Sequence, residues 1–190
     1  MCEDDCEGKI CCLCFCTVIL LILATSVGFL IVAIVTPPEK VAILDANLTR
    51  FELTANQTTL FYNLSFTMKI HKYKEADYHD MDVDCYYNTK KFDSRKLGDL
   101  KLKIRRTRLL NLSSNGNSTM DLESNGVDAF KRSNETGFFD LEIQLKGKRI
   151  SESDDGTRYT YKLSYQCNLR LQLENSQNST QGNFKPVKCH

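Results

Sequence analysis

The chain has 190 residues and a formal net charge of +1 at pH 7, which is long enough for one domain and a membrane segment. This near-neutral balance lacks the concentrated positive charge that nucleic-acid binding requires, so no nucleic-acid partner is expected. The nine cysteines fall into a dense N-terminal group and a dispersed C-terminal group, which indicates two redox environments.

The first predicted element is a membrane-spanning helix at residues 10–36. Residues 10–35 carry no charged side chain, and a helix of that length extends roughly 39 Å, more than the ~30 Å hydrocarbon core of a bilayer. Pro37 and Pro38 end it, because proline cannot continue a helix. The rival interpretation is a signal peptide cleaved near Ala24-Thr25-Ser26, but acidic residues precede the apolar run and the run exceeds a signal peptide's length.

Sequons for N-glycosylation lie only on the C-terminal side of this helix, at Asn47, Asn56, Asn63, Asn111, Asn117, Asn134 and Asn178. Because such glycans mark secreted or extracellular segments, residues 37–190 are expected outside the cell. Residues 1–9 would then form a short cytoplasmic tail. The numbers of Lys and Arg on the two sides of the helix are nearly equal, so the positive-inside rule does not decide the orientation. That rule also holds only weakly for long translocated domains. The predicted location is the plasma membrane, with the lipid bilayer as one partner.

A cysteine cluster stands where the predicted helix enters the membrane, at Cys11, Cys12, Cys14 and Cys16. Thiols at this boundary are accessible to acyl transfer, which predicts palmitoylation of at least one of them. The alternative is that they pack as small hydrophobic residues. Zinc binding is disfavoured, because paired Cys-x₂-Cys units and a nearby histidine are both missing.

Strands are predicted beyond residue 40, because apolar residues recur there at every second position. The alternating stretches are residues 41–53, 60–70, 81–87, 100–104, 139–145 and 159–173, with a weaker one at 118–130. Turn signals stand at Ser114-Asn115-Gly116, Asn125-Gly126 and Asp154-Asp155-Gly156. Six or seven strands with one wet face each predict an all-β domain, an antiparallel β-sandwich.

Three cysteines fall in this domain, Cys85, Cys167 and Cys189, so one intramolecular disulfide can form and one thiol is left over. The preferred pair is Cys167–Cys189, because this bond would fold back the polar tail at 174–186, which has no alternation. A Cys85–Cys167 bridge across the core is the main rival, and the absence of any bond is the third alternative. Cys85 lies on an apolar strand face, where a buried thiol behaves as a small hydrophobe.

Sequence motifs for catalysis are missing: there is no phosphate-binding glycine loop, nucleophile elbow or zinc-protease helix. We therefore assign no catalytic residue, cofactor or metal site and predict that the chain is not an enzyme. Asp80, Asp82 and Asp84 resemble the start of a calcium loop, but Cys85 and Lys91 stand where that loop needs glycine and glutamate. A solvated strand face is the preferred interpretation of these acids.

A basic segment follows, with Asp99 as its one acidic residue: Arg95, Lys96, Lys101, Lys103, Arg105, Arg106 and Arg108. The preferred interpretation is a solvated strand whose lysines protect a sheet edge. The functional alternative is a polyanion site, in which Lys101, Lys103, Arg105 and Arg106 contact anionic lipid headgroups or acidic wall polysaccharide.

Four phrases follow the proline-ended helix in a fixed order: VAILDANLTRFELT, TLFYNLSFTMKI, CYYNTKKF and YQCNLRLQL. This order resembles the plant harpin-induced and non-race-specific-disease-resistance-like proteins, whose outer part is a late embryogenesis abundant type 2 domain. The chain departs from that family after Ile70, where HKYKEADYHD replaces the usual Asn-Pro-Asn phrase.

The resemblance implies an immunoglobulin- or fibronectin-III-like sandwich, a plasma-membrane location and a role in defence or stress. That role would act through contact with the wall, the membrane or a membrane or apoplastic protein partner. The alternative is a cell-surface receptor or adhesion glycoprotein with an unrelated immunoglobulin-like domain, which would require an exposed aromatic or apolar patch.

Overall fold

The computed structural model describes residues 40–190 except 55, 57, 72–75, 103–105, 154–155 and 175–183, together with residues 18, 19, 21–23 and 25. The chain divides into two compact units, Met1–Pro38 and Glu39–His190. The described residues of the first unit are helical. The rest of the predicted span at 10–36, its cysteine cluster and the tail at 1–9 lie outside the described residues. In the part that is described, no helix combines the length and the apolar character needed to cross a membrane.

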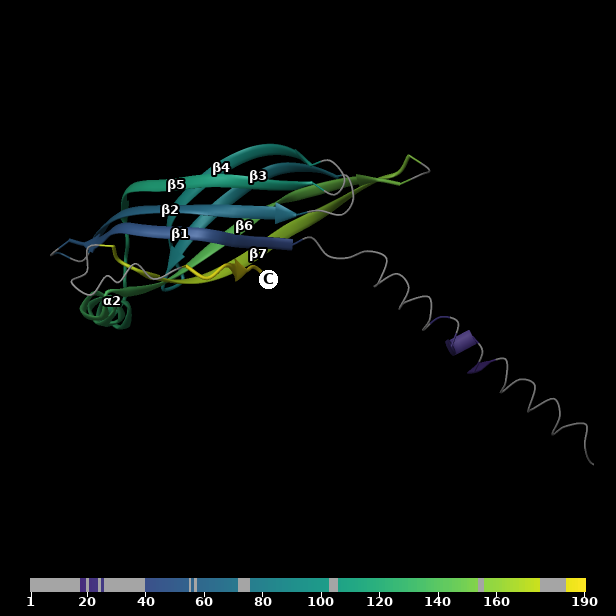
Figure 1. The fold of residues 1–190 in the computed structure, drawn as a ribbon. Coiled ribbons are helices and arrows are strands. Elements are labelled where there is room, and N and C mark those ends of the chain that lie inside the picture. Colours follow the sequence, from purple (N-terminus) through teal and green to yellow (C-terminus); the bar gives the residue numbers. More distant parts are fainter. Residues whose placement is uncertain are drawn as a thin grey trace, which may run out of the picture. The chain divides into compact units, whose positions relative to one another are not determined.

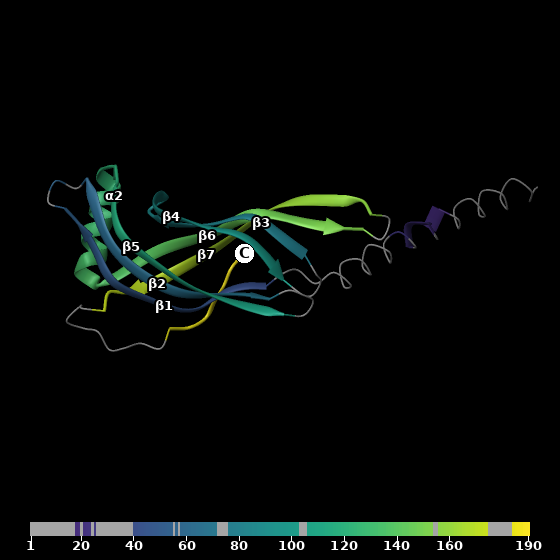
Figure 2. The same ribbon diagram turned by 90° about the horizontal axis from the view of Figure 1, so that it is seen from above.

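The second unit is an all-β domain with one helix (Figure 1). Its elements are β1 (Lys40–Leu53), β2 (Thr59–His71), β3 (Ala76–Tyr87), β4 (Lys90–Leu102), β5 (Thr107–Thr119), α2 (Ser124–Thr136), β6 (Phe138–Glu152), β7 (Arg158–Gln172) and β8 (Val187–Lys188). The strands form two four-stranded sheets, sheet A in the order β5-β2-β1-β8 and sheet B in the order β4-β3-β6-β7. Neighbours within each sheet are antiparallel, and Figure 2 shows the strands from above.

The hydrophobic core lies between the two sheets, because each sheet turns its apolar alternate residues inward. Strand β2 shows the pattern most fully, with Leu60, Tyr62, Leu64, Phe66, Met68 and Ile70 all buried. In sheet B the buried residues of β6 alternate in the same way, from Phe139 to Leu145. The predicted inward faces of these strands are confirmed.

An aromatic cluster joins the sheets and the helix at one end of the domain. Phe51 of β1 is fully buried at its centre, with ring centroids 4.9 Å from Phe139 of β6 and 5.3 Å from Tyr87 of β3. Its ring also stacks on Phe130 of α2 at 5.8 Å. Large rings in edge and stacked contacts contribute beyond the area they bury, so this cluster fixes α2 against the open end of the sandwich.

Helix α2 corrects two sequence predictions. The weaker strand predicted at 118–130 ends at Thr119, and Asn125-Gly126 lies in the first turn of the helix instead of forming a turn between strands. Gly126, Val127 and Phe130 are the buried residues of α2, and their spacing matches one helical face. The helix ends at Gly137, whose φ of 72° is the left-handed geometry that glycine adopts most readily. With β5 and β8 included, the described residues form eight strands instead of six or seven.

The predicted turn at Ser114-Asn115-Gly116 is also wrong, because these residues lie inside β5. Gly116 has a packing reason: a Cβ atom there would lie 3.2 Å from the hydroxyl of Tyr62 on the neighbouring strand. The third turn signal is correct in place, since Gly156, with φ of 80°, lies between β6 and β7. Asp154 and Asp155 are outside the described residues.

Candidate functional site

The basic segment is distributed over the outermost strands of both sheets. Strand β4 is at one edge of sheet B, β5 is at one edge of sheet A, and the two strands contact each other. The solvent-exposed side chains Arg95, Lys96, Lys101, Arg106 and Arg108 line them, and we call this set the basic edge. Lys103 and Arg105 lie outside the described residues. Lysines on an unpaired edge strand hinder the addition of a strand from another molecule. Because β4 and β5 are edge strands, their position also agrees with the interpretation that these cations protect the sheet edges.

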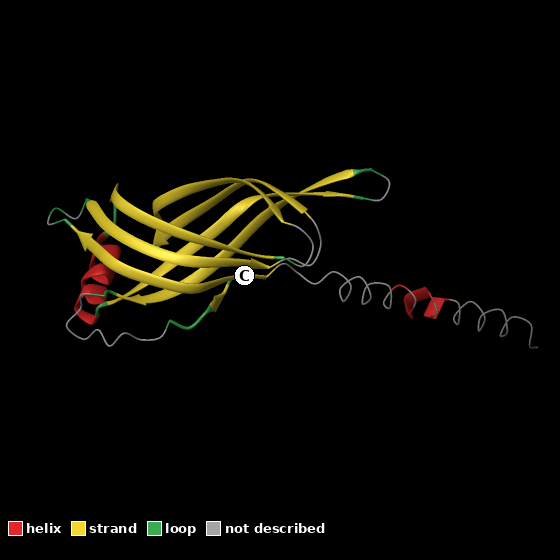
Figure 3. Cartoon of the chain, turned by 45° about the horizontal axis from the view of Figure 1, so that its top comes forward, coloured by secondary structure: helices red, strands yellow, loops and turns green. Residues whose placement is uncertain are grey.

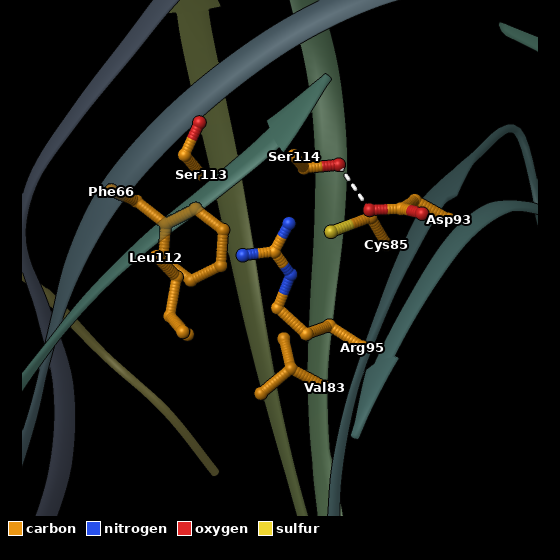
Figure 4. Close-up of a pocket in the computed structure, with 8 residues that line it drawn as sticks. All are labelled: Phe66, Val83, Cys85, Asp93, Arg95, Leu112, Ser113 and Ser114. Atoms are coloured by element: carbon orange, nitrogen blue, oxygen red, sulfur yellow. Dashed lines mark hydrogen bonds between the residues drawn. The ribbon is translucent and has the colours of Figure 1, made fainter. Parts of the chain in front are cut away.

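A small cleft opens between the two edge strands (Figure 4). Its lining is Phe66, Val83, Cys85, Asp93, Arg95, Leu112, Ser113 and Ser114. The Ser114 hydroxyl donates a hydrogen bond to the Asp93 carboxylate, and the Arg95 guanidinium extends between the two walls. Arg95 therefore belongs both to the basic edge and to this cleft, where its planar group is suited to a carboxylate or phosphate oxygen.

Cys85 is the free cysteine of the described residues, and it is buried in this cleft. Burial, together with the negative charges of Asp93 and Asp84, raises the pKa of its thiol to about 12. Since the thiolate is the nucleophilic form, Cys85 stays neutral and weakly reactive at physiological pH.

Two of the three acids that resemble a calcium loop, Asp80 and Asp84, pair with different lysines. Asp84 is buried, which corrects the solvated-face interpretation for this residue, and it accepts hydrogen bonds from Ser94 at 2.6 Å and Lys146 at 3.0 Å. Burial alone would raise the pKa of Asp84, but these two donors hold it below its usual value. Asp80 instead pairs with Lys148 at 2.8 Å. Across the described residues, no group of three His, Cys, Asp or Glu side chains is placed to hold a metal ion.

The disulfide joins Cys167 of β7 to Cys189, as predicted, with their Cα atoms 4.4 Å apart. It fixes the end of the chain against both sheets. Strand β8 pairs with β1 through Ile43 and Val187, while backbone hydrogen bonds link His190 to Gln166 of β7. The rival Cys85–Cys167 bond does not form.

The sequon asparagines that are described are all at least partly exposed: Asn47, Asn56, Asn63, Asn111, Asn117 and Asn134. Asn63 faces outward from β2, since its neighbours Tyr62 and Leu64 are buried. The register pairs Asn111 with Thr67 and Asn117 with Phe61 of β2, and Asn47 with Ser65. Because directly paired residues share a face, Asn47, Asn63, Asn111 and Asn117 lie together on the outer face of sheet A. Asn178 is outside the described residues.

The alternation pattern wrongly predicted that two tyrosines are buried. Tyr159 and Tyr161 begin the longest alternating run, so they were expected to face the core, but 47% and 44% of their surface is exposed. The cause is that the β6–β7 hairpin extends beyond the other strands (Figure 3). The guanidinium of Arg149 lies over the Tyr161 ring, 4.7 Å from its centroid. Arg158 and Lys162, which flank the two tyrosines in the sequence, are the feature from which their solvent exposure could have been predicted.

Comparison with known proteins identifies no family: no family model and no curated protein matches the sequence. Among solved structures, the chain is similar to a crystal structure of a protein from Archaeoglobus fulgidus, with 7% identity, a TM-score of 0.36, and coverage of 68% of this chain and 96% of that one. It is also similar to a protein of Arabidopsis thaliana solved in solution, with 11% identity, a TM-score of 0.35, and coverage of 72% and 83%.

Proposed function

We propose that the chain is a non-enzymatic, single-pass glycoprotein of the plasma membrane. Residues 10–36 cross the bilayer, residues 1–9 lie in the cytoplasm, and the β-domain lies outside the cell. The observation that carries the proposal is the Cys167–Cys189 disulfide. Disulfides persist in oxidising compartments and are rare in the cytosol, so the bond favours the extracellular side for the whole domain.

The sequons support the same orientation. An oligosaccharide needs a solvent-accessible asparagine; among the described sequon asparagines Asn63 is half-buried and the others are exposed. The outer face of sheet A carries Asn47, Asn63, Asn111 and Asn117, whereas no sequon falls on the strands of sheet B. Glycans on sheet A would leave sheet B and the basic edge accessible to a partner.

For its biological role, we favour a defence or stress protein of the plant harpin-induced and late embryogenesis abundant type 2 kind, with an immunoglobulin-like sandwich. Two of the four phrases that carry the resemblance coincide with whole strands, and the other two with parts of strands. They correspond to β1, to β2, to the turn of the β3–β4 hairpin and to the second half of β7. The hairpin turn at Asn88 and Thr89 uses positive φ angles of 46° and 66°, a backbone requirement that explains an asparagine in CYYNTKKF.

The domain acts by contact, and its basic edge is the part best suited to a polyanion. Exposed cations on two adjacent edge strands present positive charge to phosphate or carboxylate groups. Changing Lys101 and Arg106 to Gln should weaken binding to anionic liposomes or to polygalacturonate, whereas the same change at Lys131 and Arg132 of α2 should not. Binding that is unaffected by both pairs, or by added salt, would favour edge protection as the only role of these cations.

Topology is tested on intact plant cells that express the full chain. Protease added outside should remove the β-domain and leave a membrane-embedded fragment that resists alkaline extraction. A domain that stays protected until the membrane is opened would refute the extracellular orientation. A fully extractable chain would refute the anchor at residues 10–36.

A further inference from the structure

The charged residues of the β-domain are distributed unevenly between its two ends. One end is formed by the start of β1, the junction of β4 and β5, and the β6–β7 hairpin, as the strand register shows. We call it the basic end, and α2 lies at the opposite end (Figure 3). The exposed cations of the basic end are Lys40, Lys101, Arg106, Arg108, Lys148, Arg158 and Lys162.

Three acidic residues near the basic end have a side-chain partner, and a fourth, Asp77, lies opposite Lys101 in the register of β3 and β4. Asp80 pairs with Lys148 at 2.8 Å, Asp99 with His79 at 2.9 Å, and Glu152 with Arg158 at 3.3 Å. The end with α2 is close to balanced, because its seven acidic residues face six cations. The acids are Glu52, Asp121, Glu123, Asp128, Glu135, Asp140 and Glu174, and the cations are Arg50, Lys90, Lys91, Lys131, Arg132 and Arg170. At the basic end the exposed cations outnumber the described acids Asp77, Asp80, Asp99 and Glu152, so the positive pole of the domain lies at this end.

Exposed apolar surface coincides with this positive pole. Tyr159 and Tyr161 lie on one face of the β6–β7 hairpin, with ring centroids 6.5 Å apart. Leu109, near the start of β5, is 56% exposed. Tyrosine has an apolar ring and a polar hydroxyl, which suits the boundary between lipid headgroups and hydrocarbon. Cations beside such rings are the combination that binds phosphate-bearing membrane surfaces.

Chain connectivity selects the membrane as the occupant. Lys40 opens β1 only four positions after residue 36, where the proposed anchor ends, and four residues reach at most ~14 Å. Most sequons lie away from this end: Asn56 and Asn134 lie toward α2, and none falls on the β6–β7 hairpin. Asn111 is the nearest described sequon, two positions beyond Leu109 on the outer face of sheet A. A bulky glycan on the hairpin itself would keep the domain away from a bilayer.

We infer that the basic end rests on the phosphate headgroup layer of the bilayer that anchors the chain, with Tyr159 and Tyr161 at headgroup depth. This inference rests on the proposed anchor at residues 10–36. It orients the domain with its strands rising from the membrane and with α2 farthest from it. Sheet A, with its glycans, and sheet B then face sideways, toward neighbouring molecules.

The absence of tryptophan from the chain makes the test direct. The full chain, with Tyr161→Trp as its one tryptophan, is reconstituted into phosphatidylcholine vesicles that contain anionic phosphatidylglycerol and a lipid with a nitroxide on its headgroup. Phe138→Trp, at the α2 end and 38% exposed, is the matched control. We expect blue-shifted, nitroxide-quenched emission for Tyr161→Trp and neither effect for Phe138→Trp. Tyr159→Trp serves as a second probe if the first variant does not fold.

Charge variants separate headgroup contact from simple tethering. In the Tyr161→Trp background, changing Lys101, Arg106 and Lys162 to Gln should restore the emission seen in water, while the same change at Lys90, Lys131 and Arg132 should leave the quenching intact. Equal emission in both triple variants, or loss of quenching on adding polygalacturonate, would overturn the inference. If the chain does not float with the vesicles, the anchor itself is wrong and the inference falls with it.

Discussion

Removing the Cys167–Cys189 bond should destabilise the β-domain by a calculable amount. The two cysteines are 22 residues apart, and the chain-entropy model gives about 3 kcal/mol for a loop of that length. Cys189→Ser removes the bond while leaving the buried Cys167 in place. A loss of about 3 kcal/mol corresponds to a fall in melting temperature of roughly 6–12 °C for a domain of this size.

Urea unfolding of residues 39–190, followed by tyrosine fluorescence, measures this loss. Wild-type protein in reductant should match Cys189→Ser, and reductant should have no effect on the variant. A difference below about 1 kcal/mol between oxidised and reduced wild type would refute the reasoning, because it would mean that β8 and the tail dock without the covalent link. A reductant effect that persists in Cys189→Ser would show that a different cysteine pair is responsible.

Three further outcomes are expected. Phe51→Ala should lower the free energy of unfolding by about 3–5 kcal/mol, because it leaves a cavity at the centre of the aromatic cluster. Phe138→Ala should lower it much less, because Phe138 is 38% exposed. Equal losses would contradict the packing described. The pKa of Asp84 is lowered in the folded state, so its contribution to folding stability is present above about pH 4 and is lost as the pH falls further. Asp84→Asn should therefore reduce the loss of stability at acidic pH. An unchanged acid dependence would exclude Asp84 as its source. The Cys85 thiol, with its pKa raised to about 12 by burial, should resist iodoacetamide at pH 8 until urea unfolds the domain, and rapid alkylation of native protein would show that the cleft opens.

Strands that bury a continuous apolar face could be predicted from the sequence, because a period of two is a strong signal when every inward residue is large. Strand β2 is the clearest case, with six inward residues from Leu60 to Ile70. Strand β5 escaped prediction because its inward positions include Ser114, Gly116 and Ser118, which carry little apolar character. Its strand geometry is imposed by pairing with β2 along its whole length.

The helix α2 escaped prediction for a different reason. Asn125-Gly126 is a common turn signal, but Gly126 is buried here against Leu122 and the Asn88 side chain. A Cβ atom at this position would lie 2.7 Å from the Asn88 amide, so the glycine serves close packing. Such a contact depends on the tertiary fold and leaves no local pattern in the sequence.

In the candidate site, the basic edge could be recognised from the sequence as a cluster of charges. The disulfide could be predicted because it holds down a polar tail that has no strand pattern. The uneven distribution of charge along the domain could not be recognised, because Lys101, Arg149 and Lys162 are brought to one end only by strand register. The exposure of Tyr159 and Tyr161 likewise follows from the length of the β6–β7 hairpin relative to its neighbours.

Site-resolved mass spectrometry of the full chain, purified from the membranes of eukaryotic cells that express it, tests the extracellular placement of the β-domain most directly. We expect glycans on sheet A, at one or more of Asn47, Asn63, Asn111 and Asn117, in the same molecules that contain a Cys167–Cys189 linked peptide. Unmodified asparagines throughout, together with free thiols at Cys167 and Cys189, would contradict the extracellular placement and return the domain to the cytoplasm.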